Sequence, residues 1–104
     1  MPLSSRQKRY LRGLAHSLDP VVIVGQKGVT PSLLKELDGA LVHHELIKVR
    51  LAEADRDDRA ETIEALCEGA NAELVQTIGR VAALYRRNPE EPTIELPAEP
   101  KKRR

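Results

Sequence analysis

Apolar residues recur along the chain at two spacings, one typical of helices and the other typical of strands. The helical spacing predicts three helices, over residues 4–18, 30–44 and 55–70. Asp19-Pro20 should end the first helix, because the residue before a proline disfavours helical backbone. The apolar side chains expected to face the core from these helices are Leu11, Leu14, Ala15, Leu18, Leu33, Leu34, Leu37, Leu41, Ala60, Ile63, Leu66, Cys67 and Ala70.

The expected helix starts carry side chains that can satisfy the first backbone N–H groups. Ser4 and Gln7 stand at the spacing of a capping box. Thr30 should cap the second helix, with Pro31 in its first turn, where a missing N–H costs little. The acids of residues 55–58 should lie near the positive end of the third helix.

Strand patterns separate and follow these helices. Residues 21–24, VVIV, are apolar at every position, so we expect them to be covered on both faces, as central parallel strands are. In ELIKVRLAE, residues 45–53, apolar side chains alternate with Lys48 and Arg50, which predicts a strand with one solvent-exposed face.

Residues 74–78 and 81–86 should pair as a hairpin through Gly79-Arg80, a dipeptide that suits a type II′ turn. The full order is then α-β-α-β-α-β-β. It predicts a single α/β domain of the two-layer α+β kind, with a four-stranded mixed sheet and helices packed on it. We expect this domain to span residues 1–88.

The remaining residues, 89–104, alternate prolines with charged side chains, so this tail should be mostly disordered, apart from a short extended piece at Thr93–Leu96. Elsewhere the composition is typical of a globular protein, with 40% hydrophobic and 32% charged residues. No apolar run approaches the roughly 20 residues of a membrane helix. The N-terminus lacks the apolar stretch of a signal peptide. We therefore expect a cytoplasmic protein, monomeric and without membrane attachment.

Two groups of residues could suggest a reactive or metal-binding site, but the sequence favours a structural role for both. Cys67 is the single cysteine, which excludes an intramolecular disulfide and a cysteine-based metal cluster, and its place on an apolar stripe predicts an inert core thiol. His43-His44-Glu45 resembles a metal or acid–base cluster, but adjacent histidines point in different directions on a helix and no H-E-x-x-H spacing exists. We expect these histidines to serve the helix end. No cofactor and no catalytic residue is expected.

Charge is segregated along the chain although the net charge is only +1. Residues 1–50 hold eight Lys/Arg against four Asp/Glu, whereas residues 51–88 hold five against eight. Residues 4–18 contain no acid at all, which is unusual because surface helices commonly mix signs. The polar face of this first helix carries Arg6, Lys8, Arg9, Arg12 and His16. Such a face suits phosphate contact.

The turn between the first strand and the second helix is Gly25-Gln26-Lys27-Gly28. It matches neither a P-loop nor the dinucleotide fingerprint. Two interpretations stay open. The glycines either supply positive φ in a tight turn, or they let backbone N–H groups approach phosphates, as the G-x-x-G loop of KH domains does. In the second case the helix N-terminus behind the loop would also favour an anion.

Three runs together carry a resemblance: LSSRQKRYLRGLAHSLDPVVIVGQKGVT, LLKELDGALVHHELIKVRL and VQTIGRVAALYR. Over roughly residues 3–87 the chain closely resembles the bacterial single-domain CRM proteins of the YhbY type, CRM standing for chloroplast RNA splicing and ribosome maturation. The resemblance implies a fold similar to the C-terminal domain of a bacterial translation initiation factor. It also implies RNA binding by the G-x-x-G loop, association with precursors of the large ribosomal subunit, and no enzymatic activity.

The sequence thus predicts a noncatalytic protein that binds structured RNA, expected to be ribosomal RNA of the large-subunit precursor. With no Phe or Trp and only two tyrosines, it can hardly build an aromatic platform for base stacking, so backbone and shape recognition are favoured. The expected RNA-binding residues are Gly25, Gln26, Lys27, Gly28, Arg6, Lys8, Arg9, Arg12, His16, Lys48 and Arg50. Two alternatives are a protein–protein adaptor that docks through Glu61 and Glu64, and an enzyme for a small phosphate ligand.

Overall fold

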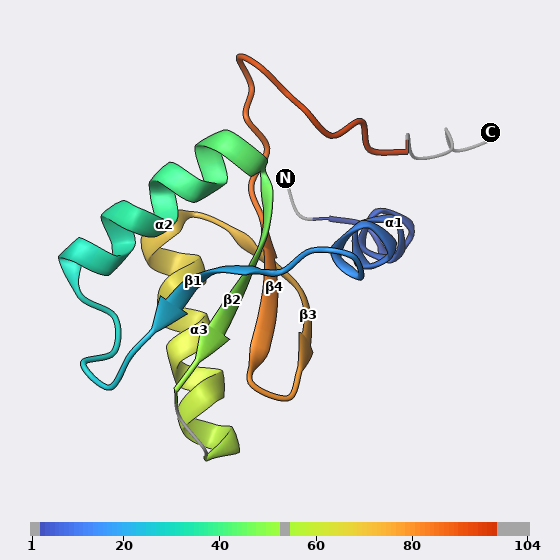
Figure 1. Ribbon diagram of the computed structural model, residues 1–104. Coiled ribbons are helices and arrows are strands. Elements are labelled where there is room, and N and C mark those ends of the chain that lie inside the picture. Colours follow the sequence, from blue (N-terminus) through green and yellow to red (C-terminus); the bar gives the residue numbers. More distant parts are fainter. Residues whose placement is uncertain (1–2, 53–54, 98–104) are drawn as a thin grey trace, which may run out of the picture.

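The computed structural model describes residues 3–52 and 55–97. The elements follow the predicted order, as Figure 1 shows: α1 (Ser5–Ala15), β1 (Pro20–Val24), α2 (Pro31–His44), β2 (Leu46–Leu51), α3 (Arg56–Ala70), β3 (Glu73–Ile78) and β4 (Val81–Tyr85). The four strands form one sheet in the order β1-β2-β4-β3. β1 pairs with β2 in parallel, and the other two pairings are antiparallel. This arrangement confirms the predicted α+β fold and the mixed sheet.

The two faces of the sheet carry two separate core clusters. α2 and α3 pack on one face and bury side chains such as Leu37, Leu66 and Ile47. α1 packs on the opposite face, where Leu11 and Ala15 meet Leu46 and further sheet side chains. Because successive strand residues point to opposite faces, neighbouring residues of β2 and β4 belong to different clusters.

Local sequence signals set the helix starts as predicted. Both bonds of the capping box are present: the Ser4 hydroxyl accepts the N–H of Gln7 at 3.1 Å, and the Gln7 side chain accepts the N–H of Ser4 at 3.2 Å. Thr30 caps α2 by accepting the N–H of Leu33 at 3.1 Å. Asp55 caps α3 by accepting two N–H groups of the first turn.

The first helix is shorter than predicted. It ends at Ala15, and the N–H of Leu18 then bonds to the carbonyl of Ala15 in a turn, at 3.0 Å. Only Leu11 and Ala15 are buried, whereas Leu14 and Leu18 are each 37% exposed. The expected four-residue stripe was therefore wrong in two members, because the turn carries Leu18 off the helical face.

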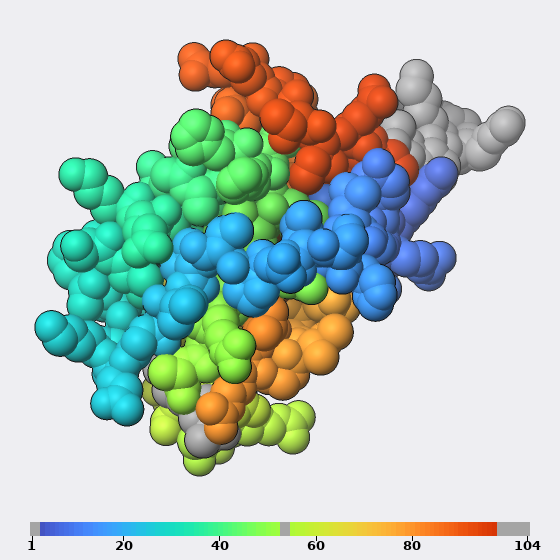
Figure 2. Space-filling model, in the orientation of Figure 1, coloured from blue at the N-terminus to red at the C-terminus, as the bar shows by residue number. Residues whose placement is uncertain are grey.

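The interpretation of residues 21–24 as a doubly covered central strand was also wrong. β1 is an edge strand, and only Val22 and Val24 are buried. Val21 is 51% exposed and Ile23 is 66% exposed, because α1 lies over the other half of this sheet face and leaves β1 open. In Figure 2 the light-blue α1–β1 segment runs across the front of the molecule at its surface.

The remaining helices and the hairpin agree closely with their patterns. In α2 the predicted stripe is buried at Leu33, Leu37 and Leu41. In α3 three of the five predicted core residues are buried, Cys67 is half-buried, and Ala60 is exposed. Gly79 has a φ of 57°, and it supplies the positive angle that a type II′ turn needs at its first central position.

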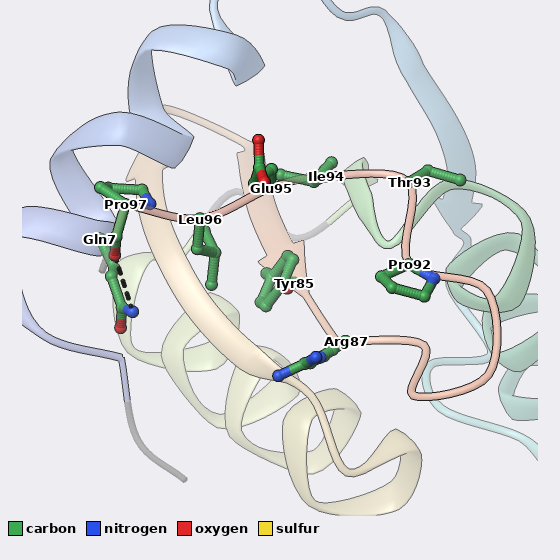
Figure 3. A pocket seen from close by; sticks show the side chains of 9 residues that line it. All are labelled: Gln7, Tyr85, Arg87, Pro92, Thr93, Ile94, Glu95, Leu96 and Pro97. Carbon is green, nitrogen blue, oxygen red and sulfur yellow. Dashed lines mark hydrogen bonds between the residues drawn. The ribbon is translucent and has the colours of Figure 1, made fainter. Parts of the chain in front are cut away.

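The C-terminal segment was expected to be mostly disordered, but its described part, up to residue 97, lies against the domain. Ile94 and Leu96 pack on the cluster beneath α1. Figure 3 shows this segment passing over Tyr85, with the Gln7 side chain donating to the Pro97 carbonyl at 3.3 Å. A cavity of about 430 Å³ lies between the segment and α1. The boundary at residue 88 stays a prediction.

The segment is held by Glu45, which is fully buried although it carries a carboxylate. Its oxygens accept the N–H groups of Asn88, Thr93 and Ile94 and the Thr93 hydroxyl, at 2.6 to 3.0 Å. Its backbone has a φ of 61°, a conformation that non-glycine residues seldom adopt. These bonds satisfy the buried charge, and among the described residues no ion pair to Glu45 adds to them.

Candidate nucleic-acid interface

The loop from Gly25 to Gly28 is a tight turn closed by a bond from the Gly28 N–H to the Gly25 carbonyl, at 3.0 Å. Gly28 has a φ of 73°. Neither Gln26 nor Lys27 has positive φ, which fits a type I turn, where glycine is favoured at the fourth position. The turn interpretation therefore accounts for Gly28.

It does not account for Gly25. This residue is not among the glycines with positive φ, so its backbone does not require glycine. A Cβ built at Gly25 meets nothing within 4 Å, so packing inside the domain does not require glycine either. The missing side chain leaves the outer surface of the turn open to close approach from outside, as contact with a phosphate backbone would need.

The elements around the loop favour negative charge. Lys27 is exposed in the turn, and α2 begins three residues after Gly28. The first turn of α2 contains no acid, so its positive dipole end is not neutralised by its own side chains. The loop therefore combines the exposed Lys27 side chain with the fixed partial positive charge at the start of α2.

The cations of the first helix do not lie beside this loop. Arg6, Arg9 and Arg12 are exposed on α1, and Lys8 is half-buried. Figure 1 places α1 at one side of the sheet and the β1–α2 loop at the far end of β1. The basic face of the helix and the loop therefore form an extended arrangement, not one cluster of cations.

Three further predicted residues, Lys48 and Arg50 of β2 and His16 at the end of α1, lie between the first helix and the loop. His16 and Lys48 line the same groove, which opens on the sheet face beside the α1–β1 connection. Arg50 pairs with Ile23, two residues before the loop. The groove also contains one acid, Asp19. The structure thus brings His16 and Lys48 together and sets Arg50 on the way to the loop.

Sequence reasoning missed the apolar part of this surface. Val21, Ile23 and Ile78 are exposed on the same sheet face as Lys48 and Arg50, and Gln76 lines the groove. The exposure of β1 could not be predicted, because the unbroken apolar run VVIV predicts burial on both faces of the strand. Alternation in β2 was the signal that one sheet face stays open.

The two histidines and the cysteine considered in the sequence analysis lie in ordinary structural positions. His43 and His44 lie exposed in the last turn of α2, with ring centroids 6.2 Å apart. Burial raises the pKa of the Cys67 thiol, and the charge of Glu73 raises it further, as expected of an unreactive thiol. Over residues 3–52 and 55–97, no group of His, Cys, Asp and Glu side chains is arranged to hold a metal ion. Within the same ranges, no helix has the length and hydropathy that crossing a membrane requires.

Residues 3–86 match the CRS1 / YhbY (CRM) domain. The chain belongs to this family. The match confirms the resemblance carried by the three sequence runs, and it covers every helix and strand of the CRM fold described above.

Relatives of this CRM chain span almost its whole length. An RNA-binding protein of Haemophilus influenzae is 50% identical over 95 residues, which are 91% of this chain and 95% of that protein. The probable RNA-binding protein YqeI of Bacillus subtilis is 42% identical over 95 residues, covering 91% and 99%. The solution structure of a hypothetical protein of Staphylococcus aureus, described as a candidate RNA-binding protein, shares 43% identity and a TM-score of 0.81, covering 92% of this chain and 100% of that one.

Proposed function

We propose that this CRM chain is a noncatalytic RNA-binding protein that holds the phosphate backbone of structured RNA with its Gly25–Gly28 loop. The relatives named above are described as RNA-binding proteins, which supports the class of ligand. The resemblance to YhbY-type proteins supports ribosomal RNA of the large-subunit precursor as the target. In this role the protein acts as a cytoplasmic monomer during assembly of that subunit.

The observation that carries the proposal is the unexplained glycine at position 25. Gly25 has neither positive φ nor a close neighbour within the domain, so no internal constraint uses this glycine and the turn is sterically open to a backbone that approaches from outside. An incoming phosphate meets the backbone N–H groups of the turn there, and Lys27 adds a mobile positive charge. Phosphate contacts of this kind supply affinity and orientation more than sequence choice.

The remaining cations extend the contact along the RNA. Arg50 and Lys48 follow the loop across the sheet face, and His16 leads on to the basic face of α1. An RNA helix or loop lying along this path meets positive charge over its length. Each contact with phosphate releases condensed counterions, so affinity should fall steeply with salt.

A salt titration of binding to large-subunit ribosomal RNA tests the proposal. The slope of log affinity against log salt should become less steep by about 0.7 to 0.9 when Lys27→Glu removes one phosphate contact. The matched control is Arg87→Glu, which changes charge equally at the end of the sheet opposite the loop. The control should keep most of the wild-type affinity.

A Lys27→Glu variant that binds like the Arg87→Glu control would remove the loop from the interface. Association with ribosomal particles that survives ribonuclease, and is lost on changing the exposed Glu61 and Glu64, would instead support the adaptor. Wild-type binding with no salt dependence would sink the proposal altogether.

A further inference from the structure

Half of one sheet face is not covered by any described element. β-Strand pairing sets Ile23, Arg50, Val81 and Ile78 in one row across the four strands. A second row holds Lys48, Ala83 and Gln76. The third row, containing Leu46 and Tyr85, lies beneath α1 and the C-terminal segment. We call the first two rows, with Val21 and without Ala83, the open sheet face, because Ala83 is buried in the cluster beneath α1.

The open sheet face is strongly apolar for an exposed surface. Ile23 is 66% exposed, Ile78 is 67% exposed and Val21 is 51% exposed. Several large apolar side chains exposed on one face of a sheet commonly mark an interaction site. In Figure 2 the green of β2 and the orange of the β3–β4 hairpin reach the surface beneath the blue α1–β1 segment.

The surface is hollowed where it meets the end of α1. A groove of about 370 Å³ runs between the α1–β1 connection and the strands. Its walls combine apolar side chains, Leu18 and Ile78 among them, with the polar groups of His16, Asp19, Lys48 and Gln76. A floor of aliphatic carbon with a few polar groups at the side is the usual composition of a small-ligand site.

We infer that the open sheet face holds an unpaired nucleotide of the RNA whose backbone the glycine loop grips. The inference rests on the proposed function and adds a subsite to it. The base lies flat on Ile78 and Val81, as bases pack on apolar side chains in base-flipping enzymes. Lys48 and Arg50 meet the flanking phosphates, and the amide of Gln76 faces the base edge.

Charge and chemistry select this occupant over a protein. The open sheet face contains two cations, Lys48 and Arg50, and the groove beside it adds one acid, Asp19. This excess of positive charge matches an RNA chain, which carries one negative charge per nucleotide. The Gln76 amide offers both a donor and an acceptor, as a base edge requires. Ile23, at the edge of the first row, is two residues before Gly25. One RNA strand can therefore pass from the loop to the groove. A paired base cannot enter, because its edge and faces are occupied within the helix.

Affinity for two RNAs with equal phosphate number tests the inference. One is a fully paired duplex, and the other is a hairpin with unpaired uridines in its loop. Wild type should bind the hairpin about tenfold more tightly than the duplex. Ile78→Ala, at a largely exposed position, should weaken hairpin binding about fivefold to tenfold and leave duplex binding unchanged. Gln76→Ala should act in the same direction.

The matched control is Val42→Ala, which removes a 48% exposed side chain from α2, on the opposite side of the sheet. It should not change either affinity. If Ile78→Ala, Gln76→Ala and Val42→Ala all bind both RNAs like wild type, while Lys27→Glu still weakens both, the nucleotide subsite is wrong and the proposed function stands. If neither RNA binds in a salt-dependent way, the proposed function fails and the subsite fails with it.

A second copy of the chain is the competing occupant, and sedimentation distinguishes it. The wild-type protein should sediment as a monomer at the concentrations used for RNA binding. A dimer that Ile23→Ala or Ile78→Ala disperses would assign the open sheet face to self-association and would overturn the inference.

Discussion

The carboxylate of Glu45 accepts the backbone N–H of Thr93 at 2.7 Å, across 48 residues of sequence. The same oxygen accepts the N–H of Ile94, also at 2.7 Å, and the second oxygen accepts that of Asn88. The main chain of Glu45 also accepts the N–H of Arg86, at 2.9 Å. One residue between α2 and β2 thus fixes the course of the chain after β4.

Replacing Glu45 with glutamine should destabilise the domain by about 1–3 kcal/mol, in the range of hydrogen bonds to charged groups. Glutamine keeps one acceptor oxygen, but its NH₂ group then faces a backbone N–H donor. Urea unfolding measures the loss. Glu91→Gln, which alters an exposed side chain of the same segment, is the control and should leave stability unchanged. Equal midpoints for the two variants would contradict a holding role for Glu45.

The stabilisation by Glu45 should depend on pH. Burial acts to raise its pKa, but the hydrogen bonds from Asn88, Ile94 and Thr93 outweigh burial, so the pKa lies below the ordinary 4.5. A carboxyl whose pKa is lower in the folded state stabilises fully above its unfolded pKa and loses this contribution as pH falls through the folded value. The stability difference between wild type and Glu45→Gln should therefore be constant near neutrality and shrink below pH 4.5. A difference that grows on acidification would show the opposite sign of linkage.

Arg86 should contribute to stability rather than to RNA binding. Its guanidinium donates to the Asp38 carboxylate and to the Ala70 carbonyl at the end of α3, both at 2.8 Å. Arg86→Ala should cost about 1–3 kcal/mol. Asp38→Ala should cost less than about 1 kcal/mol, because that carboxylate is 60% exposed and the bond to Ala70 remains. Thermal unfolding compares the two variants; equal losses would show that the ion pair dominates.

The two loop glycines should respond differently to alanine. Gly28→Ala should reduce stability by about 1–2 kcal/mol, because an L side chain is strained at a φ of 73°. Gly25→Ala should leave stability within about 0.5 kcal/mol, since its Cβ enters open space. If the loop meets RNA as proposed, Gly25→Ala should nevertheless weaken binding. An unchanged RNA affinity for a stable Gly25→Ala protein would count against the clamp.

Local features of this fold could be predicted because local chemistry decides them. The capping box of Ser4 and Gln7, the Thr30 cap and the Gly79 turn each involve neighbours within a few residues. The alternation of β2 was equally informative, since Lys48 and Arg50 do lie on the less buried face.

Features set by distant parts of the chain could not be predicted in this way. An apolar VVIV segment carries no information on its place in the sheet, and Ile23 is exposed because α1 covers the other half of this sheet face. Glu45 looked like part of a polar helix end, whereas its partners come from residues 88–94. The candidate site shows the same division: the loop was visible in the sequence, but the groove of His16, Lys48 and Gln76 unites three elements.

The position of α1 has a consequence for how the protein is made. Although α1 precedes the other described elements in the chain, its buried residues Leu11 and Ala15 pack against a cluster that includes Val75, Ala83 and Tyr85, and Ile94 and Leu96 pack against this cluster. A nascent chain that has only just produced α3 therefore has little of the surface against which this helix packs. The basic face of α1 therefore takes its final place only after β3, β4 and the segment that follows them have been synthesised.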